Sequence, residues 1–159
     1  MRKLLTVILI GFMLVACDSK QVYDKYKTIP KYWGKEHRLN FNFKAPDTVK
    51  NYNLFLNIRN NNNYKFSNLF LIVDFITPNN NKTIDTLEYR MANPDGSWLG
   101  TGFSDLKENK LWFRERYRFK KQGEYKINVK HAMRKNGSIL GIEELQGITE
   151  VGFRIEKEQ

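Results

Sequence analysis

Apolar and polar residues alternate along most of the chain, with the period of two that is typical of half-buried β-strands. The alternation is strict from Leu39 to Phe43 and recurs from Tyr52 to Ile58. Further strands are predicted at residues 68–76, 83–91, 111–119, 125–133 and 151–155. The first of these is apolar on both faces, as expected of a central strand that is buried twice. The pattern predicts an all-β fold, a jelly-roll-like antiparallel β-sandwich, with a closed barrel as the alternative.

A different pattern opens the chain. Arg2 and Lys3 precede an unbroken apolar run from Leu4 to Val15. This run is too short for a transmembrane helix, which needs about 20 apolar residues. A basic start followed by an apolar stretch of this length is typical of a secretory signal peptide. We therefore predict that residues 1–16 are a signal peptide and are removed.

Cys17 follows this run directly and is the single cysteine of the sequence. The segment Leu14-Val15-Ala16-Cys17 looks like the bacterial lipobox. In lipobox proteins the cysteine thiol carries diacylglycerol, and the new amino group is usually acylated as well, for example with palmitate. Each buried methylene contributes about 0.8 kcal/mol, so two or three acyl chains anchor a protein stably. We predict lipidation of Cys17, no other cofactor, and a place in the cell envelope, on the inner or outer membrane and facing the periplasm.

The mature chain is expected to hold one folded domain. Residues 17–35 are polar and aromatic, and we interpret them as the lipidated cysteine and a tether that becomes ordered near Tyr32 and Trp33. Residues 36–159 are predicted to form a single β-sandwich domain. No cysteine remains in that part of the chain, so its stability must come from an apolar core and not from disulfides.

The chain is strongly basic, with a formal net charge of +10 at pH 7. Removal of the signal peptide takes away Arg2 and Lys3 and no acid, which leaves +8. Such a balance favours anionic partners, namely lipid headgroups, lipopolysaccharide, acidic glycans or acidic proteins. Nucleic acid is not expected as a partner, because export separates the protein from it.

Residues that could catalyse a reaction are scarce. His37 and His131 are the only histidines, and the carboxylates show no recognisable glycosidase or calcium-loop spacing. His131 follows the strand alternation toward the apolar side, so we expect a hydrogen-bonded, semi-buried residue. We predict no catalytic residues, no metal site and no enzyme. The least favoured hypothesis is an envelope hydrolase, which would need His131 within hydrogen-bonding reach of a carboxylate.

Aromatic residues offer a first candidate binding surface. Trp98 lies in a glycine-punctuated stretch, and Trp112 falls on the polar face of the predicted strand 111–119. Exposed tryptophans on a small sandwich are suited to stacking on sugar rings. The alternative is that the aromatic residues fill the core of a domain without disulfides.

Cationic residues offer a second candidate surface. Arg114, Arg116 and Arg118 alternate with apolar residues on the predicted strand 111–119, although Glu115 interrupts the apolar side. Together with lysines farther along the chain they are expected to concentrate positive charge on one sheet face, which would meet an acidic partner or a membrane surface. The alternative is an ordinary solvated face. The lysines are Lys120, Lys126 and Lys130.

Several segments, in their order along the chain, resemble the gliding motility lipoprotein GldH family. They are the lipobox, Tyr23-Asp24-x-Tyr26, Trp33, Asn68-Leu69-Phe70-Leu71, Asp85-Thr86-Leu87, the stretch from Gly96 to Gly102, Ala132-Met133-Arg134 and the stretch from Val151 to Glu156. The resemblance implies a membrane-anchored accessory of the gliding machinery of diderm bacteria, which is tied to secretion of surface adhesins. It implies other gliding and secretion proteins as partners and supplies no catalytic residues. The competing interpretation is a carbohydrate-binding envelope lipoprotein.

Overall fold

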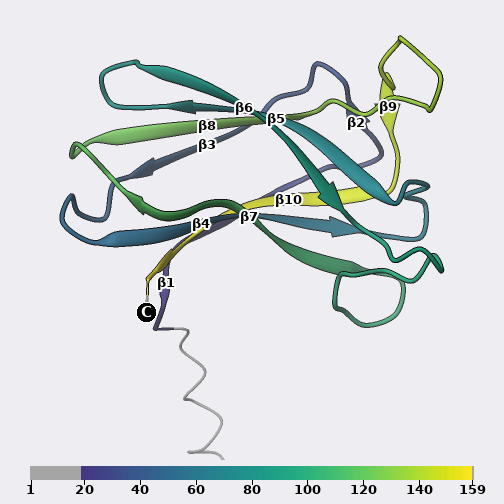
Figure 1. Ribbon diagram of the computed structural model, residues 1–159, viewed down its shortest axis with the longest axis horizontal. Coiled ribbons are helices and arrows are strands. Elements are labelled where there is room, and N and C mark those ends of the chain that lie inside the picture. Colours follow the sequence, from purple (N-terminus) through teal and green to yellow (C-terminus); the bar gives the residue numbers. More distant parts are fainter. Residues whose placement is uncertain (1–18, 159) are drawn as a thin grey trace, which may run out of the picture.

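The computed structural model describes residues 19–158, in which all regular structure is β. Two four-stranded antiparallel sheets pack face to face, and a two-stranded ribbon closes one end (Figure 1). None of the described residues belongs to a helix long and apolar enough to cross a membrane. The strands are β1 (Gln21–Thr28), β2 (Trp33–Gly34), β3 (Leu39–Lys44), β4 (Asn51–Asn60), β5 (Asn68–Ile76), β6 (Lys82–Arg90), β7 (Lys107–Arg118), β8 (Glu124–His131), β9 (Glu144–Leu145) and β10 (Ile148–Lys157).

The order of the strands is that of a jelly roll. Sheet I has the order β1-β10-β4-β7, sheet II has the order β3-β8-β5-β6, and β2 pairs with β9. The chain changes between the two large sheets six times: between β1 and β3, β3 and β4, β4 and β5, β6 and β7, β7 and β8, and β8 and β10. Because the two large sheets share no strand pairing, the predicted sandwich is confirmed and the closed barrel is not formed.

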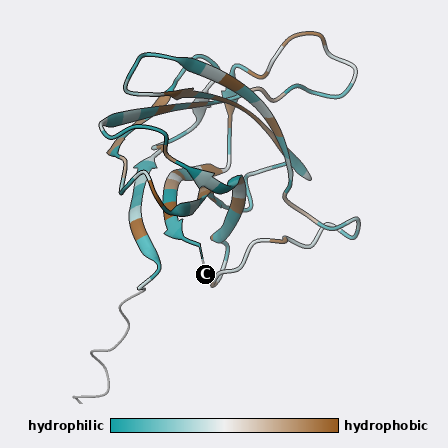
Figure 2. Cartoon of the chain, turned by 60° about the vertical axis from the view of Figure 1, so that its left-hand side comes forward, coloured by the Kyte–Doolittle hydropathy of each residue, from teal (hydrophilic) through white to brown (hydrophobic). Residues whose placement is uncertain are grey.

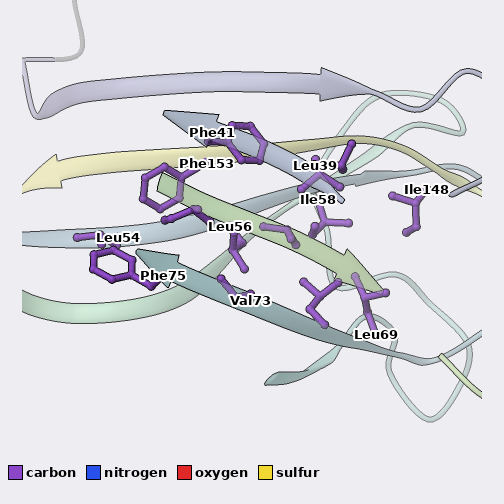
Figure 3. Packing of buried hydrophobic residues seen from close by; sticks show 14 of the residues in the cluster. Leu39, Phe41, Leu54, Leu56, Ile58, Leu69, Val73, Phe75, Ile148 and Phe153 are labelled. Carbon is purple, nitrogen blue, oxygen red and sulfur yellow. The ribbon is translucent and has the colours of Figure 1, made fainter. Parts of the chain in front are cut away.

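The core follows from the alternation in the sequence. On β3 the apolar Leu39, Phe41 and Phe43 are buried, and the residues between them are exposed. Bands of apolar and polar residues accordingly alternate along the strands (Figure 2). Side chains from the two sheets meet between the layers in a continuous cluster (Figure 3). Its members include Leu39, Phe41, Leu54, Leu56, Ile58, Leu69, Val73, Phe75, Ile148 and Phe153.

Strand β5 is central in sheet II, as predicted, but its outer face is not wholly buried. Phe70 and Ile72 are half-exposed there, whereas the inner residues of the strand are buried. The same outer face holds Asp74, which is 3% exposed and forms ion pairs with Arg38 and Lys82 at 2.9 Å each. The apolar pattern overestimated burial because no further layer formed by residues 19–158 covers this sheet.

The predicted tether is shorter than expected, because much of it folds. Residues Gln21–Thr28 form β1, an edge strand that pairs along its length with β10. Tyr23 points to the inner side, with its ring 5.6 Å from that of Phe43 and 5.8 Å from that of Phe153. Most other residues of β1 are polar, so the sequence shows no strict alternation there. Cys17 itself, the predicted lipidation site, lies outside the described residues.

The sandwich has two distinct ends. One end, here called the base, contains the connections 45–50, 77–81 and 119–123, together with the first and last described residues. Backbone hydrogen bonds join these parts, from Ala45 to Gly123 (3.1 Å) and from Lys157 to Lys20 (2.9 Å). The opposite end, here called the distal end, contains the connections 29–38, 61–67, 91–106 and 132–147. The base lies on the left in Figure 1, where the C-terminus is marked.

Candidate interaction surfaces

The outer face of sheet I carries a network of ion pairs across all four strands. On its distal half, Arg59 of β4 contacts Glu108 of β7 (2.8 Å) and Glu150 of β10 (2.6 Å). The hydroxyl of Tyr26 on β1 donates a hydrogen bond to Glu108 at 2.7 Å. Burial alone would raise the pKa of Glu108, but the hydrogen bonds from Tyr26 and Arg59 outweigh it and lower that pKa. The carboxylate therefore stays ionised, and the network holds the strands together.

A glycine allows Tyr26 to reach across the sheet. Gly152 of β10 lies opposite Tyr26, and a Cβ atom at Gly152 would come within 2.8 Å of the tyrosine ring. The ring lies over this glycine, so its hydroxyl also accepts a hydrogen bond from Asn57 of β4 at 2.9 Å. On the basal half of the face, Arg154 contacts Asp24 (2.7 Å) in the same cross-strand manner. Most of the outer face of sheet I is thus occupied by its own polar side chains.

Trp112 is the large aromatic residue that this face exposes. Its side chain is 51% exposed, and its ring lies 4.4 Å from that of Phe55. The ammonium of Lys110 lies 4.2 Å from the centre of the Phe55 ring. A shallow hollow of about 320 Å³ adjoins Trp112 toward the base. An exposed ring with apolar support and cations beside it can stack on a planar or sugar-like ligand.

Trp98 is placed differently. It is half-buried, with its ring 6.2 Å from that of Tyr64 and its indole nitrogen 3.4 Å from the side-chain oxygen of Asn62. It therefore packs at the distal end against the connection between β4 and β5. Trp112 packs on sheet I, so the structure does not bring the two tryptophans together into one platform.

The structure does not place Arg114 on the exposed cationic face where the sequence analysis expected it. Strand β7 has one extra residue at each of two register shifts opposite β4, and at the first of them Trp112 pairs with Phe55 but Arg114 pairs with the buried Leu54. A bulge re-aims the side chains that follow it, and Arg114 points inward. Its guanidinium lies 4.3 Å from the ring of Phe75 and bonds to Asp85 of β6 at 2.8 Å. It ties the open edges of the two sheets together and is not part of an exposed stripe.

Arg116 and Arg118 are exposed, but they do not share a sheet face with Lys126 and Lys130. Strand β7 belongs to sheet I and β8 to sheet II, because the chain changes sheet between them. Arg116 has a φ of 50° in the bulge and binds Glu158 at 2.6 Å. The predicted continuous cationic face is therefore not formed, and its members are distributed over the base and over two sheets.

The connection between β6 and β7 holds an apolar surface that the sequence analysis missed. Phe103 is 95% exposed, and Leu99 and Leu106 are 46% and 41% exposed. These three residues, here called the distal apolar loop, border a hollow of about 910 Å³ beside β7. Backbone hydrogen bonds between Thr101 and Glu108, at 3.0 and 2.7 Å, hold the loop against the edge of sheet I. A phenylalanine between glycine and serine, outside any alternating stretch, was the available signal.

His131 is a structural residue, as predicted, and is more deeply buried than expected, at 1% exposure. One ring nitrogen lies 3.0 Å from the carbonyl oxygen of Trp33, and the other accepts the backbone N–H of Met133 at 3.4 Å. Burial lowers the pKa of His131, so the ring is neutral at pH 7. Both ring nitrogens of His131 are thus hydrogen-bonded to backbone groups. Within the part of the chain that the structure describes, no three histidine, cysteine or acidic residues are grouped to hold a metal ion.

Burial of the neutral His131 predicts a loss of stability in mild acid. The unfolded chain binds a proton at this side chain below its ordinary pKa of about 6.5, whereas the folded chain does not. The free energy of unfolding should therefore fall by up to about 1.4 kcal/mol per pH unit as the pH drops from 6.5 to 5. Urea denaturation at several pH values measures this effect. The free energy of unfolding should depend less steeply on pH in His131→Gln, and as steeply as in the parent chain in His37→Gln, whose side chain is exposed. An unchanged slope in His131→Gln would disprove the assignment.

A family model described as GldH lipoprotein matches residues 21–155, from the first residue of β1 nearly to the end of β10. The chain belongs to the GldH lipoprotein family. It is 50% identical to "Gliding motility lipoprotein GldH" of Flavobacterium johnsoniae, over 95% of this chain and 94% of that protein. It is 49% identical to "Gliding motility lipoprotein GldH homolog" of Christiangramia forsetii, over 99% and 98%. The resemblance inferred from the sequence is thereby confirmed.

A distant likeness to a solved structure was also found. The VP2 subviral particle of infectious bursal disease virus matches with a TM-score of 0.38 and 13% identity. The match covers 89% of this chain and 34% of the VP2 chain. The GldH-family chain thus spans about a third of the VP2 chain.

Family segments far apart in sequence lie together in sheet I. The Tyr23-Asp24-x-Tyr26 segment of β1 pairs with the stretch from Val151 to Glu156 of β10. Asp24 faces Arg154, and Tyr26 lies over Gly152. The GldH-like features of the two chain ends therefore form one structural unit next to the point where the chain enters the domain.

Proposed function

We propose that this GldH-family chain is a lipoprotein, anchored through lipid on Cys17, that serves the gliding motility machinery and its linked protein secretion without catalysing a reaction. The main support is the 50% identity, over nearly the full length of both chains, to a protein named gliding motility lipoprotein GldH. The protein would face the periplasm from the inner or outer membrane. Its partners would be other envelope proteins of the machinery and the membrane, and not nucleic acid.

Several contacts support a binding protein over an enzyme. Both nitrogens of His131 are engaged by backbone groups in the core. The carboxylates of Glu108 and Glu150 are engaged by Arg59 across the strands of sheet I. These groups stabilise the fold and leave no free base beside a nucleophile at these places. The lipid on Cys17 would be the only attached group, and it serves as an anchor.

The distal apolar loop is the surface we assign to a protein partner. Phe103 exposes nearly its whole side chain to water, and contiguous exposed apolar surface typically marks an interaction site. The hollow beside it is bordered by charged side chains, Arg59, Arg90 and Lys110 among them, which would form a polar rim. The loop lies at the end opposite the chain entry, so a partner protein at the membrane could reach it without displacing the anchored end.

Substitution of Phe103 tests this assignment. Phe103→Ser should leave the free energy of unfolding unchanged within about 0.5 kcal/mol, because the side chain contacts little in the domain. It should reduce crosslinking to, and co-purification of, gliding or secretion proteins roughly tenfold, as expected for a central aromatic contact. Ile84→Ser, at a 62% exposed residue of β6, is the matched control and should keep full capture. Equal capture by both variants would remove the loop from the proposal.

Carbohydrate binding is the second candidate, and Trp112 alone favours it. Its half-exposed ring is supported by Phe55 and adjoins a hollow that Lys110 also lines. With Trp98 packed elsewhere, any such site would be a single stacking position. A glycan array without saturable binding would dismiss this reading.

A further inference from the structure

The base concentrates exposed cations. Lys44 and Lys50 flank the connection between β3 and β4, and Arg118, Lys120 and Lys121 lie at the end of β7 and in the turn that follows. Lys157 at the end of β10 adds another exposed cation. All of these side chains are exposed and lie where the chain enters and leaves the sandwich.

Acidic residues at the base do not cancel this charge. Asp47 accepts hydrogen bonds from the Tyr52 hydroxyl (2.5 Å) and from the backbone of Val49 and Lys50. Those hydrogen bonds, that of Tyr52 first, lower the pKa of Asp47 and tie the carboxylate to the loop. Glu158 is held by Arg116 at 2.6 Å. Glu124, exposed at the start of β8, is a third acid at this end. Three acids thus stand against the six cations named above, so positive charge is in excess at the base.

The distal end is closer to balance. Lys35 pairs with Glu143 at 2.9 Å, and Lys130 pairs with Glu36 at 3.1 Å. In all, the distal connections hold six cations and five acids: Lys31, Lys35, Arg38, Lys65, Arg134 and Lys135, and Glu36, Asp95, Asp105, Glu143 and Glu144. The positive charge of the mature chain is thus polarised toward the base.

The start of β1 limits how far the base can be from the anchor. Cys17 precedes Lys20 by three residues, and a fully extended chain spans at most about 3.6 Å per residue. The lipidated residue would therefore lie within about 11 Å of the base. This distance is comparable with the Debye length of about 8 Å at physiological ionic strength. A tether through residue 35 would have placed no such limit.

We infer that the base docks on the anionic phospholipid surface of the membrane, an inference that rests on the anchor proposed for Cys17. The sandwich then stands with its strands leading away from the bilayer. Strand β10 has ten residues, so the distal apolar loop would be held about 30 Å from the lipid. The two ends have different tasks in this arrangement, since the base contacts lipid and the distal end contacts protein.

Vesicle binding without the anchor tests the inference. The probe is the mature chain carrying Cys17→Ser, which retains every residue of the sandwich, mixed with phosphatidylcholine vesicles with or without phosphatidylglycerol. One variant combines Arg118→Gln, Lys120→Gln and Lys121→Gln at the base. Its matched control combines Lys31→Gln, Lys65→Gln and Lys135→Gln in the distal connections, with the same change of charge. Equal thermal midpoints establish that all proteins are folded.

We expect binding to the anionic vesicles only, and its loss when NaCl is raised from about 0.1 M to about 1 M, which shortens the Debye length from about 10 Å to about 3 Å. Each cation near an anionic surface contributes roughly a fivefold factor, so the basal variant should bind on the order of 100-fold more weakly. The distal variant should bind within about threefold of the parent. Equal loss in both variants, or no preference for anionic lipid, would overturn the inference. Fatty-acid labelling of Cys17 is a separate readout, so failure of the anchor and failure of the docking are distinguishable.

Discussion

Cys17→Ser should abolish incorporation of labelled fatty acid and release the protein from the membrane fraction. The substitution removes the only thiol in the sequence that a lipid transferase could modify. Two or three acyl chains bury dozens of methylenes at about 0.8 kcal/mol each, whereas the basal cations alone give reversible attachment. The change in partitioning is therefore expected to be close to complete.

The measurement is metabolic labelling with an alkyne palmitate analogue, followed by fractionation of cells in high salt. Ser19→Ala is the matched control, since it changes a neighbouring exposed residue and should leave labelling intact. Normal labelling of Cys17→Ser would show that the lipobox interpretation is mistaken. Membrane retention without labelling would point to another means of attachment.

Trp33→Ala should lower the free energy of unfolding by about 3–5 kcal/mol, the usual cost of truncating a large buried aromatic residue. Trp33 is 0% exposed, and its indole nitrogen donates a hydrogen bond to the carbonyl oxygen of His37 at 2.9 Å. Its ring lies 5.5 Å from that of His131 in an edge arrangement. The substitution would leave a cavity at the distal end and unpair that carbonyl oxygen.

Urea denaturation measures this effect directly. Tyr32→Ala is the adjacent control, and because Tyr32 is 37% exposed its loss should cost no more than about 1 kcal/mol. Similar losses in the two variants would contradict the placement of Trp33 in the core. They would also restore the interpretation of this segment as a tether.

The alternation of apolar residues was enough to predict the strands that line the core. Leu39, Phe41 and Phe43 show the reason, since each second side chain of β3 points between the sheets. The same rule does not say which strands pair. It therefore placed Arg118 and Lys130 on one face, although β7 and β8 belong to different sheets. Strand order depends on contacts between distant segments, which periodicity does not contain.

Two other misses have local physical causes. Strand β1 is an edge strand with mostly polar side chains, so Tyr23 alone marked its inner face. In β7 the bulge shifts the register, and Arg114 moves to the inner side. Glu115, which interrupts the apolar face in the sequence, was the visible sign of that shift. Phe103 lies in a connection, where no strand period applies, and only its exposure in the fold marks it as a candidate contact.

The two ends of the sandwich carry different surfaces in the described part of the chain. The base carries cations and the chain entry, whereas the distal end carries exposed apolar residues, Phe103 foremost among them. Sheet I between them is braced by ion pairs such as that of Arg154 with Asp24. A rigid spacer with different surfaces at its two ends is suited to holding a partner protein at a set height above a membrane.

The most direct test of the central claim is deletion of the gene in its native bacterium, with surface spreading and export of surface adhesins measured together. The account predicts that deletion abolishes spreading or export, that the wild-type gene restores it, and that Cys17→Ser and Phe103→Ser do not. Normal spreading and normal export in the deletion strain would contradict the account.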